Sequence, residues 1–221
     1  MRPLVAGVVV LAALVAAIPA LAQAPPQPLS GFVIDAHGVS GGLPDGPGWV
    51  ADVPEGTLLP ARSLGLDGSA HVYLAHLGPV TLGAGARLVF VRGTTTAPVV
   101  DDTDGAAANT VPDVTTRFRA FAPEVSFNFG HRRGWSYISG GVGRARVENE
   151  ATLGATTVTA GPDGWVSIFN YGGGARWMIT RHIGFSFDLR WHQLSGLDAT
   201  ETFPGAMRSK LFVAGAGISI H

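Results

Sequence analysis

The 221-residue chain contains no cysteine, which excludes a disulfide framework and any metal site built on thiolates. Charged residues are also scarce: they make up 14% of the chain, and the formal net charge is −1. The sequence has no cluster of lysine and arginine of the kind that contacts nucleic-acid phosphates. Nucleic acid is therefore not among the expected partners.

A long hydrophobic run occurs once, at the N-terminus. Arg2 precedes an apolar stretch over residues 4–18, and the small residues Ala20 and Ala22 follow it. This order is typical of a secretory signal peptide, and about 15 apolar residues are short for a helix that spans a membrane. We therefore predict a signal peptide over residues 1–22.

Two cleavage positions fit the small residues at the end of this segment. A cut after Ala22 leaves Gln23 as the first residue of the mature chain. A cut after Ala24 would leave Pro25 beside the cleaved bond, which we expect to hinder the protease. We expect the mature chain to begin at Gln23, with residues 23–30 as a short segment before the folded domain.

Helix signals are rare after residue 22, and alternation of apolar and polar residues takes their place. The clearest example is the stretch over residues 183–194, in which two different faces alternate strictly. One face carries Ile183, Phe185, Phe187, Leu189 and Trp191, and the other carries Gly184, Ser186, Asp188, Arg190 and His192. A period of two with one apolar face predicts a β-strand.

Eight segments of this kind predict the fold. They cover residues 31–40, 62–77, 80–92, 115–129, 135–147, 165–179, 183–194 and 208–220. Short connections at 78–79, 130–134 and 180–182 alternate with long ones at 41–61, 93–114, 148–164 and 195–207. This alternation is typical of outer-membrane barrels, so we predict an all-β, eight-stranded antiparallel up-and-down transmembrane β-barrel over residues 31–221. In the second segment either His71 and Tyr73 or Val72 and Leu74 could face lipid, because a one-residue slip exchanges the two faces.

Aromatic residues lie near the ends of the predicted strands, as in the girdles of membrane barrels. At the short-turn end these are Phe127, Phe129, Trp135, Tyr137, Trp177 and Phe185, and at the other end Phe90, Trp165 and Trp191. The polar face instead repeats glycine, at Gly83, Gly85, Gly172, Gly174, Gly215 and Gly217. We expect these glycines to make room in a narrow lumen.

In these features the chain resembles the small bacterial outer-membrane β-barrel proteins of the OmpA/OmpX type, without a periplasmic domain. The resemblance covers the chain from about Gly31 onward and includes the final strand over residues 215–220. Members of the family usually end in an aromatic residue, whereas this chain ends in His221. The resemblance implies an integral outer-membrane protein with a structural, surface-contact or weak permeation role. It also implies three partners: outer-membrane lipids, lipopolysaccharide and the outer-membrane assembly machinery.

The polar face carries three acids and three bases, so we predict a polar network in the lumen. The six residues are Asp35, Arg87, Glu124, Arg176, Asp188 and Arg190. Charges removed from water are costly unless they are paired, and arginine can meet a carboxylate with two parallel hydrogen bonds. A turn at 180–182 would place Ser186 opposite Arg176 and Asp188 on the diagonal. The hypothesis is a plug of arginine–carboxylate pairs that blocks ion flow.

We considered two other functions. Some outer-membrane barrels are lipid A deacylases, with a histidine and a serine two residues apart on a late strand and an acid after them. Here His192 and Ser195 are three apart and would face opposite sides, with Glu201 following, so we expect no catalytic residue. A secreted lipocalin-like binder would have an apolar inside, whereas here the charges lie opposite the large aromatics.

Cofactor and metal motifs are incomplete. The glycines at 141–143 and 172–174 lack the third glycine and the following helix of a dinucleotide loop. The run DDTDG at 101–105 has Val100 and Val111 where a calcium loop needs oxygen ligands. We therefore expect neither a cofactor nor a metal site, and we interpret this run as part of a set of acidic outer loops.

Overall fold

The computed structural model describes residues 28–29, 31–44, 49, 59–96, 112–153, 155–160, 162, 164–201, 203 and 205–221. These residues form nine strands in one antiparallel sheet. The strands are β1 (Phe32–Gly41), β2 (Ser63–Leu77), β3 (Val80–Thr95), β4 (Asp113–His131), β5 (Gly134–Leu153), β6 (Thr156–Ala160), β7 (Val166–Met178), β8 (Ile183–Leu194) and β9 (Ser209–Ile220). None of the described segments is a helix long and apolar enough to cross a membrane.

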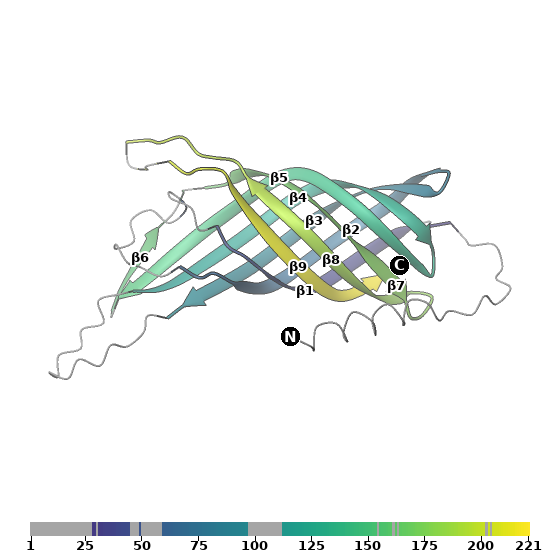
Figure 1. The fold of residues 1–221 in the computed structure, drawn as a ribbon, viewed down its shortest axis with the longest axis horizontal. Coiled ribbons are helices and arrows are strands. Elements are labelled where there is room, and N and C mark those ends of the chain that lie inside the picture. The colour runs from purple at the N-terminus through teal and green to yellow at the C-terminus, as the bar shows by residue number, and fades with distance from the viewer. Residues whose placement is uncertain are drawn as a thin grey trace, which may run out of the picture.

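The sheet closes on itself. Its strand order is β4-β3-β2-β1-β9-β8-β7-β5, and a further pairing of β4 with β5 completes the ring (Figure 1). Each strand of the ring pairs with its neighbours in the sequence, and β1 pairs with β9, so the topology is up-and-down. The structure thereby confirms the predicted eight-stranded barrel. Strand β6 lies outside the ring, because it pairs with β5 alone.

The two ends of the barrel differ in their connections. Short turns at 78–79, 132–133 and 179–182 lie at the end where β1 begins and β9 ends, which we call the turn end. The long connections lie at the opposite end, the loop end. There β4 begins at Asp113, two residues before the predicted 115–129, and β5 continues to Leu153, six residues beyond the predicted 135–147, where β6 pairs with it (Figure 1). The sequence did not predict this extension, because threonine, asparagine and glutamate on both faces interrupt the apolar alternation.

Side chains alternate between lumen and exterior along most of the strands. On β8 the residues Ser186, Asp188 and Arg190 are buried, while Phe185 and Leu189 are exposed. The structure also fixes the undetermined register of β2. His71 is buried and Val72 is 51% exposed, and the pairing of β2 with β3 shifts by one residue between Tyr73 and Ala75.

The predicted aromatic girdles need one correction. Trp135 and Tyr137 are only 3% and 2% exposed, so they point into the lumen and not toward the exterior. The alternation of β5 assigns the exterior to Ile138 instead, which is 56% exposed. Position near a strand end therefore did not decide the side on which these two rings lie. The other seven rings are exposed: Phe90, Phe127, Phe129, Trp165, Trp177, Phe185 and Trp191.

Most of the inward positions occupied by glycine exclude a side chain for a different reason than we expected. A Cβ on Gly85 would overlap the carbonyl of Ala70 on β2, and one on Gly217 would overlap the carbonyl of Ala36 on β1. At Gly83 a Cβ would instead meet the side chain of its partner on the neighbouring strand β4, 2.6 Å from Ser126 Oγ. Most of these glycines thus permit close approach of neighbouring strands where the sheet curves, and fewer relieve crowding among side chains.

Candidate functional site

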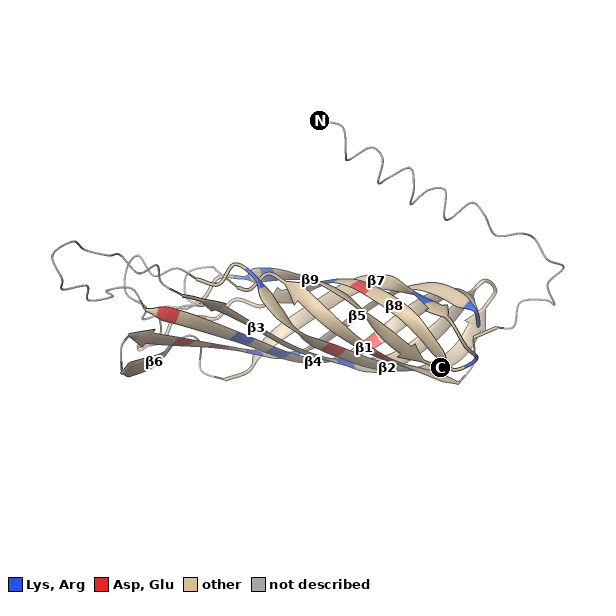
Figure 2. Cartoon of the chain, turned by 90° about the horizontal axis from the view of Figure 1, so that it is seen from below, with Lys and Arg blue, Asp and Glu red and all other residues tan. Residues whose placement is uncertain are grey.

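The lumen is filled by three successive layers, of which the middle one is polar. This polar layer consists of buried charged side chains on six different strands. Figure 2 colours all charged positions of the described chain, and those of the polar layer are among them. Its members are Asp35, Asp67, Arg87, Glu124, Arg176, Asp188 and Arg190.

Arg176 and Asp35 form the part of the polar layer nearest the turn end. Arg176 donates from Nε and Nη2 to the two carboxylate oxygens of Asp35, at 2.9 and 2.6 Å. Ser69 and Ser219 donate to the same carboxylate, at 2.9 and 2.5 Å. The guanidinium also lies over the ring of Tyr137, with Cζ 3.8 Å from the centroid. The bidentate pair is thus held in one orientation from several strands.

Arg87 and Arg190 form the rest of the layer with three acids. Arg87 donates to Asp67 at 2.6 Å, to Glu124 at 3.1 Å and to Asp188 at 3.3 Å. Arg190 donates to both oxygens of Asp188, at 3.0 and 3.1 Å, and to Glu124 at 3.0 Å. Each carboxylate in this group therefore meets at least one arginine, as buried charge requires.

The structure places all six sequence-predicted network residues in this layer, but one pairing differs from expectation. Ser186 lies opposite Arg176 on the β7–β8 ladder, as the turn length predicted. Arg176 nevertheless reaches across the lumen to Asp35 and leaves Asp188 to Arg87 and Arg190. Ladder register determines neighbours along the sheet, whereas a long side chain in a narrow barrel can also contact the opposite wall.

Sequence reasoning missed Asp67 and two histidines. Asp67 lies on β2, the segment whose register the sequence left open, and its addition gives four acids against three arginines. His37 Nδ1 lies 3.3 Å from Asp67, and His71 Nε2 lies 3.5 Å from Glu124. Acids outnumber arginines in the polar layer, and each of these two imidazoles lies beside one of the carboxylates. The alternation of polar residues through Asp67, Ser69 and His71 was the signal that could have located them.

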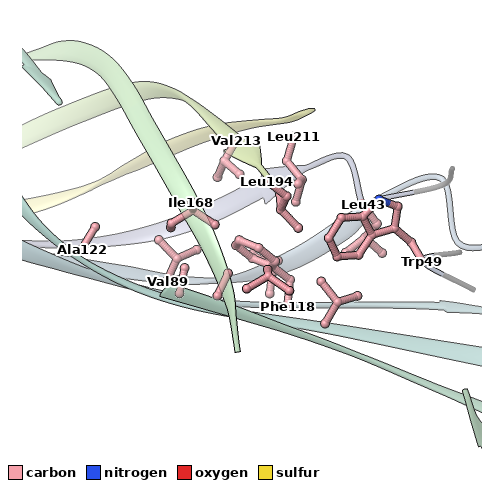
Figure 3. Close-up of a cluster of buried hydrophobic side chains, with 14 of the residues drawn as sticks. Leu43, Trp49, Val89, Phe118, Ala122, Ile168, Leu194, Leu211 and Val213 are labelled. Carbon is pink, nitrogen blue, oxygen red and sulfur yellow. The ribbon is translucent and has the colours of Figure 1, made fainter. Parts of the chain in front are cut away.

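Toward the loop end the lumen becomes apolar. Fully or nearly fully buried hydrophobic side chains from the ring strands and from two of the connections between them gather there (Figure 3). This apolar layer consists of Val39, Leu43, Trp49, Val89, Val91, Phe118, Ala120, Ala122, Ala145, Val147, Val166, Ile168, Leu194, Ala206, Leu211 and Val213. We expected a lumen that was polar throughout. In the apolar layer the inward residues of the strands are hydrophobic, as are many of the outward ones. Both faces of the barrel wall are therefore hydrophobic in this part of the barrel.

Trp49 closes the apolar layer from the long connection between β1 and β2. Its side chain is 0% exposed, and its indole Nε1 donates to the carbonyl of Met207 at 2.7 Å. Asn149 Nδ2 donates to the carbonyl of Trp49 at 2.6 Å. Trp49 is thus bound to β5 through its backbone carbonyl and to the connection before β9 through its indole.

A third cluster covers the turn end, and we call it the floor. Leu29, Val33 and Trp135 are buried together, with Tyr73 and Met178 packed against them. The ring of His221 lies 5.4 Å from that of Trp135 and 6.0 Å from that of Tyr73. Leu29 comes from the segment that precedes β1, so this segment contributes to the floor.

Comparison with known proteins rests on structure alone, since no family model and no curated protein matches the chain. Neisserial surface protein A superposes with a TM-score of 0.54 at 10% identity, over 86% of this chain and 97% of that one. The chain has the fold of a small outer-membrane β-barrel. Ail of Yersinia pestis, in complex with the heparin analogue sucrose octasulfate, gives 0.49 at 11% identity, over 86% and 99%. OprG of Pseudomonas aeruginosa gives 0.47 at 11% identity, over 88% and 97%.

The residues weighed as a deacylase triad do not meet in this barrel. His192 is buried in the lumen with both ring nitrogens lacking a hydrogen-bond partner, and its ring centroid lies 5.7 Å from that of Phe118. Ser195 and Glu201 are exposed beyond the end of β8. A serine without a histidine in reach cannot be activated by it.

The predicted acidic loops are only partly described. The DDTDG run at 101–105 lies outside the described residues. Glu150 pairs with Arg117, and Glu148 lies 2.9 Å from Arg146 and 3.4 Å from Arg119. These two glutamates therefore balance arginines on the exterior of β4 and β5. Within the described part of the chain, no group of three or more histidines and acids is placed to hold a metal ion.

Proposed function

We propose that the protein is an integral β-barrel of the bacterial outer membrane, closed to ions, with a structural or surface-contact role. The exterior of the barrel supports the membrane location. Its wall exposes large apolar side chains on every strand of the ring, among them Leu64 at 72% and Val142 at 65%. A contiguous apolar surface of this extent is unfavourable in water and favourable in lipid.

The single observation that carries the proposal of a closed barrel is the polar layer. Every charged side chain in it is buried and engaged by an opposite charge, so no charged group is free to attract a passing ion. An eight-stranded barrel has an interior just wide enough for its side chains. The apolar layer and the floor add two barriers in series.

The strands that continue past the loop end support the surface-contact part of the proposal. The extended ends of β4 and β5, together with β6, form a ribbon whose Thr156 to Thr159 are exposed. Such a ribbon offers backbone and side-chain groups to a molecule outside the cell. Neisserial surface protein A has the same barrel fold, and its name describes a surface protein.

The membrane location is tested by cell fractionation combined with electrophoresis of boiled and unboiled samples. We expect the protein in the outer-membrane fraction, with a different migration before and after boiling. Intact mass determination of the same sample tests cleavage before Gln23. A soluble protein whose migration is unchanged by heat would contradict the proposal.

Closure is tested by single-channel recording in a planar lipid bilayer. We expect no steady conductance from the folded protein. A large and steady conductance would refute the closed barrel. A heat-unfolded sample at the same concentration serves as the control for leakage from the bilayer.

A further inference from the structure

Four polar residues form one row across the exterior of the barrel near its loop end. Arg144 on β5 lies opposite Ser167 on β7, and Ser195 donates its backbone N–H to the carbonyl of Ser167 at 2.9 Å. The register between β8 and β9 continues past Leu194 to the bridge between Leu197 and Ala206, which places Ser195 opposite Arg208. All four side chains are exposed, in the order arginine, serine, serine, arginine.

An apolar groove of about 680 Å³ lies along this row, and all four residues line it. Its apolar walls include Phe121, which lies on β4 opposite Arg144, and the pair Val142 and Phe169, which lies two residues nearer the turn end on β5 and β7. The groove passes over Gly143, where a Cβ would overlap the carbonyl of Phe121. The groove therefore joins a hydrophobic hollow to a row of cationic and hydroxyl groups.

The two arginines of this row differ from the other arginines nearby. Arg117, Arg119 and Arg146 each pair with Glu148 or Glu150 on the exterior of β4 and β5. Within the described residues, neither Arg144 nor Arg208 forms an ion pair or a side-chain hydrogen bond. An unpaired guanidinium on an apolar wall is costly, unless a ligand supplies the opposite charge.

We propose that this groove binds a phosphate-bearing, acylated lipid of the outer leaflet, namely the lipid A part of lipopolysaccharide. An acyl chain lies in the hollow between Phe121, Val142 and Phe169. Phosphate oxygens accept hydrogen bonds from Arg144 and Arg208, and the two serine hydroxyls lie between them as further donors. This inference rests on the proposed outer-membrane location, since it needs the loop end to face the outer leaflet.

The spacing of the row favours a headgroup with two phosphates. Arg144 and Arg208 are separated by three strand-to-strand steps, roughly 14 Å along the row. One phosphate cannot contact both guanidinium groups at that separation unless the long side chains converge. A diphosphorylated sugar headgroup can place one phosphate on each arginine, with its chains directed into the apolar hollow.

The test is lipid binding by the protein folded into nanodiscs of phosphatidylcholine, measured by native mass spectrometry as lipid A is added. We expect saturable binding of diphosphorylated lipid A, weaker binding of the monophosphorylated form and no competition by inorganic phosphate. Loss of one arginine contact should weaken binding about fivefold, and the double variant Arg144→Gln/Arg208→Gln about thirtyfold. The matched control is Arg62→Gln/Arg92→Gln, which removes the same charge from exposed positions at the loop end of β2 and β3.

A second pair of variants tests the hollow separately from the charges. Val142→Trp fills the groove and should reduce binding, whereas Val125→Trp, on the exterior of β4 outside the groove, should not. Unchanged binding in the double arginine variant, or an equal loss in its control, would overturn the site. Equal binding of phosphatidylglycerol would overturn the choice of lipid A. Heat-dependent migration of each sample distinguishes a missing lipid site from a barrel that is not folded in the membrane.

Discussion

The polar layer and the apolar layer fill the same barrel by opposite means. In the polar layer, three arginines and four acids are held by charge-assisted bonds from six strands, so each member depends on several others. In the apolar layer, stability follows the area removed from water, and a residue from a connection, Trp49, completes the packing. The comparison teaches that buried charge makes a barrel sensitive to single substitutions, whereas apolar packing loses stability in proportion to volume.

The largest effect is expected from Arg176→Ala. It leaves the carboxylate of Asp35 buried without its bidentate partner, so we expect a loss of about 3–5 kcal/mol in the free energy of unfolding from lipid vesicles. Single-channel recordings should show a small conductance that the unmutated protein lacks, and Asp188→Ala should show the same.

The double variant Asp35→Ala/Arg176→Ala is the control for this prediction. Because it removes both charges, it should recover part of the lost stability. Full additivity of the two single losses would mean that the pair is not coupled, and the polar layer would then not be the network that its distances suggest.

A smaller loss is expected from Trp49→Ala in the apolar layer. Removing a fully buried indole costs about 3 kcal/mol, at the low end for such truncations, because the connection can move into the space. The variant should still show no steady conductance, since the polar layer is unchanged. Urea unfolding and bilayer recording of the same preparation measure both. An open channel in this variant would show that the apolar layer, and not the charged one, seals the barrel.

The sequence predicted the strands that form the barrel wall better than the side-chain contacts inside the lumen. Alternation located β8 at residues 183–194 and implied closure of eight strands, because the period of two is a local property. Contacts across the lumen are not local. The meeting of Arg176 with Asp35, 141 positions apart in the sequence, depends on barrel diameter and side-chain reach. The inward direction of Trp135 likewise depends on which face of β5 the closed sheet turns inside.

The lipid-facing wall is tested by Phe187→Arg. Phe187 lies near the middle of β8, so an arginine there should cost about 2–4 kcal/mol in folding into a bilayer. Leu64→Arg, on the exterior near the loop end of β2, should cost about 0–1 kcal/mol because it lies near the interface. Equal costs at both positions would argue against a membrane centred on the barrel. Ser186 is unsuitable as a control, because it is fully buried and bonds His37 at 2.8 Å.

The smallest effect is expected at the boundary between the two layers. His192 is buried beside Phe118 and has no hydrogen-bond partner at either ring nitrogen, so its polar atoms lie among apolar neighbours without compensation. Replacing it by leucine removes two unsatisfied polar atoms at the cost of a slightly different shape. We therefore expect His192→Leu to leave the free energy of unfolding within about 1 kcal/mol of the unmutated value, or to raise it. His37→Leu is the contrasting variant, because it breaks the contacts with Asp67 and Ser186 and should be clearly destabilising. A marked loss of stability in His192→Leu would place this residue in the polar layer.

The same variant also tests catalysis. Neither the unmutated protein nor His192→Leu should release acyl chains from lipid A. Acyl release that disappears in both His192→Leu and Ser195→Ala would establish the hydrolase activity that the geometry argues against.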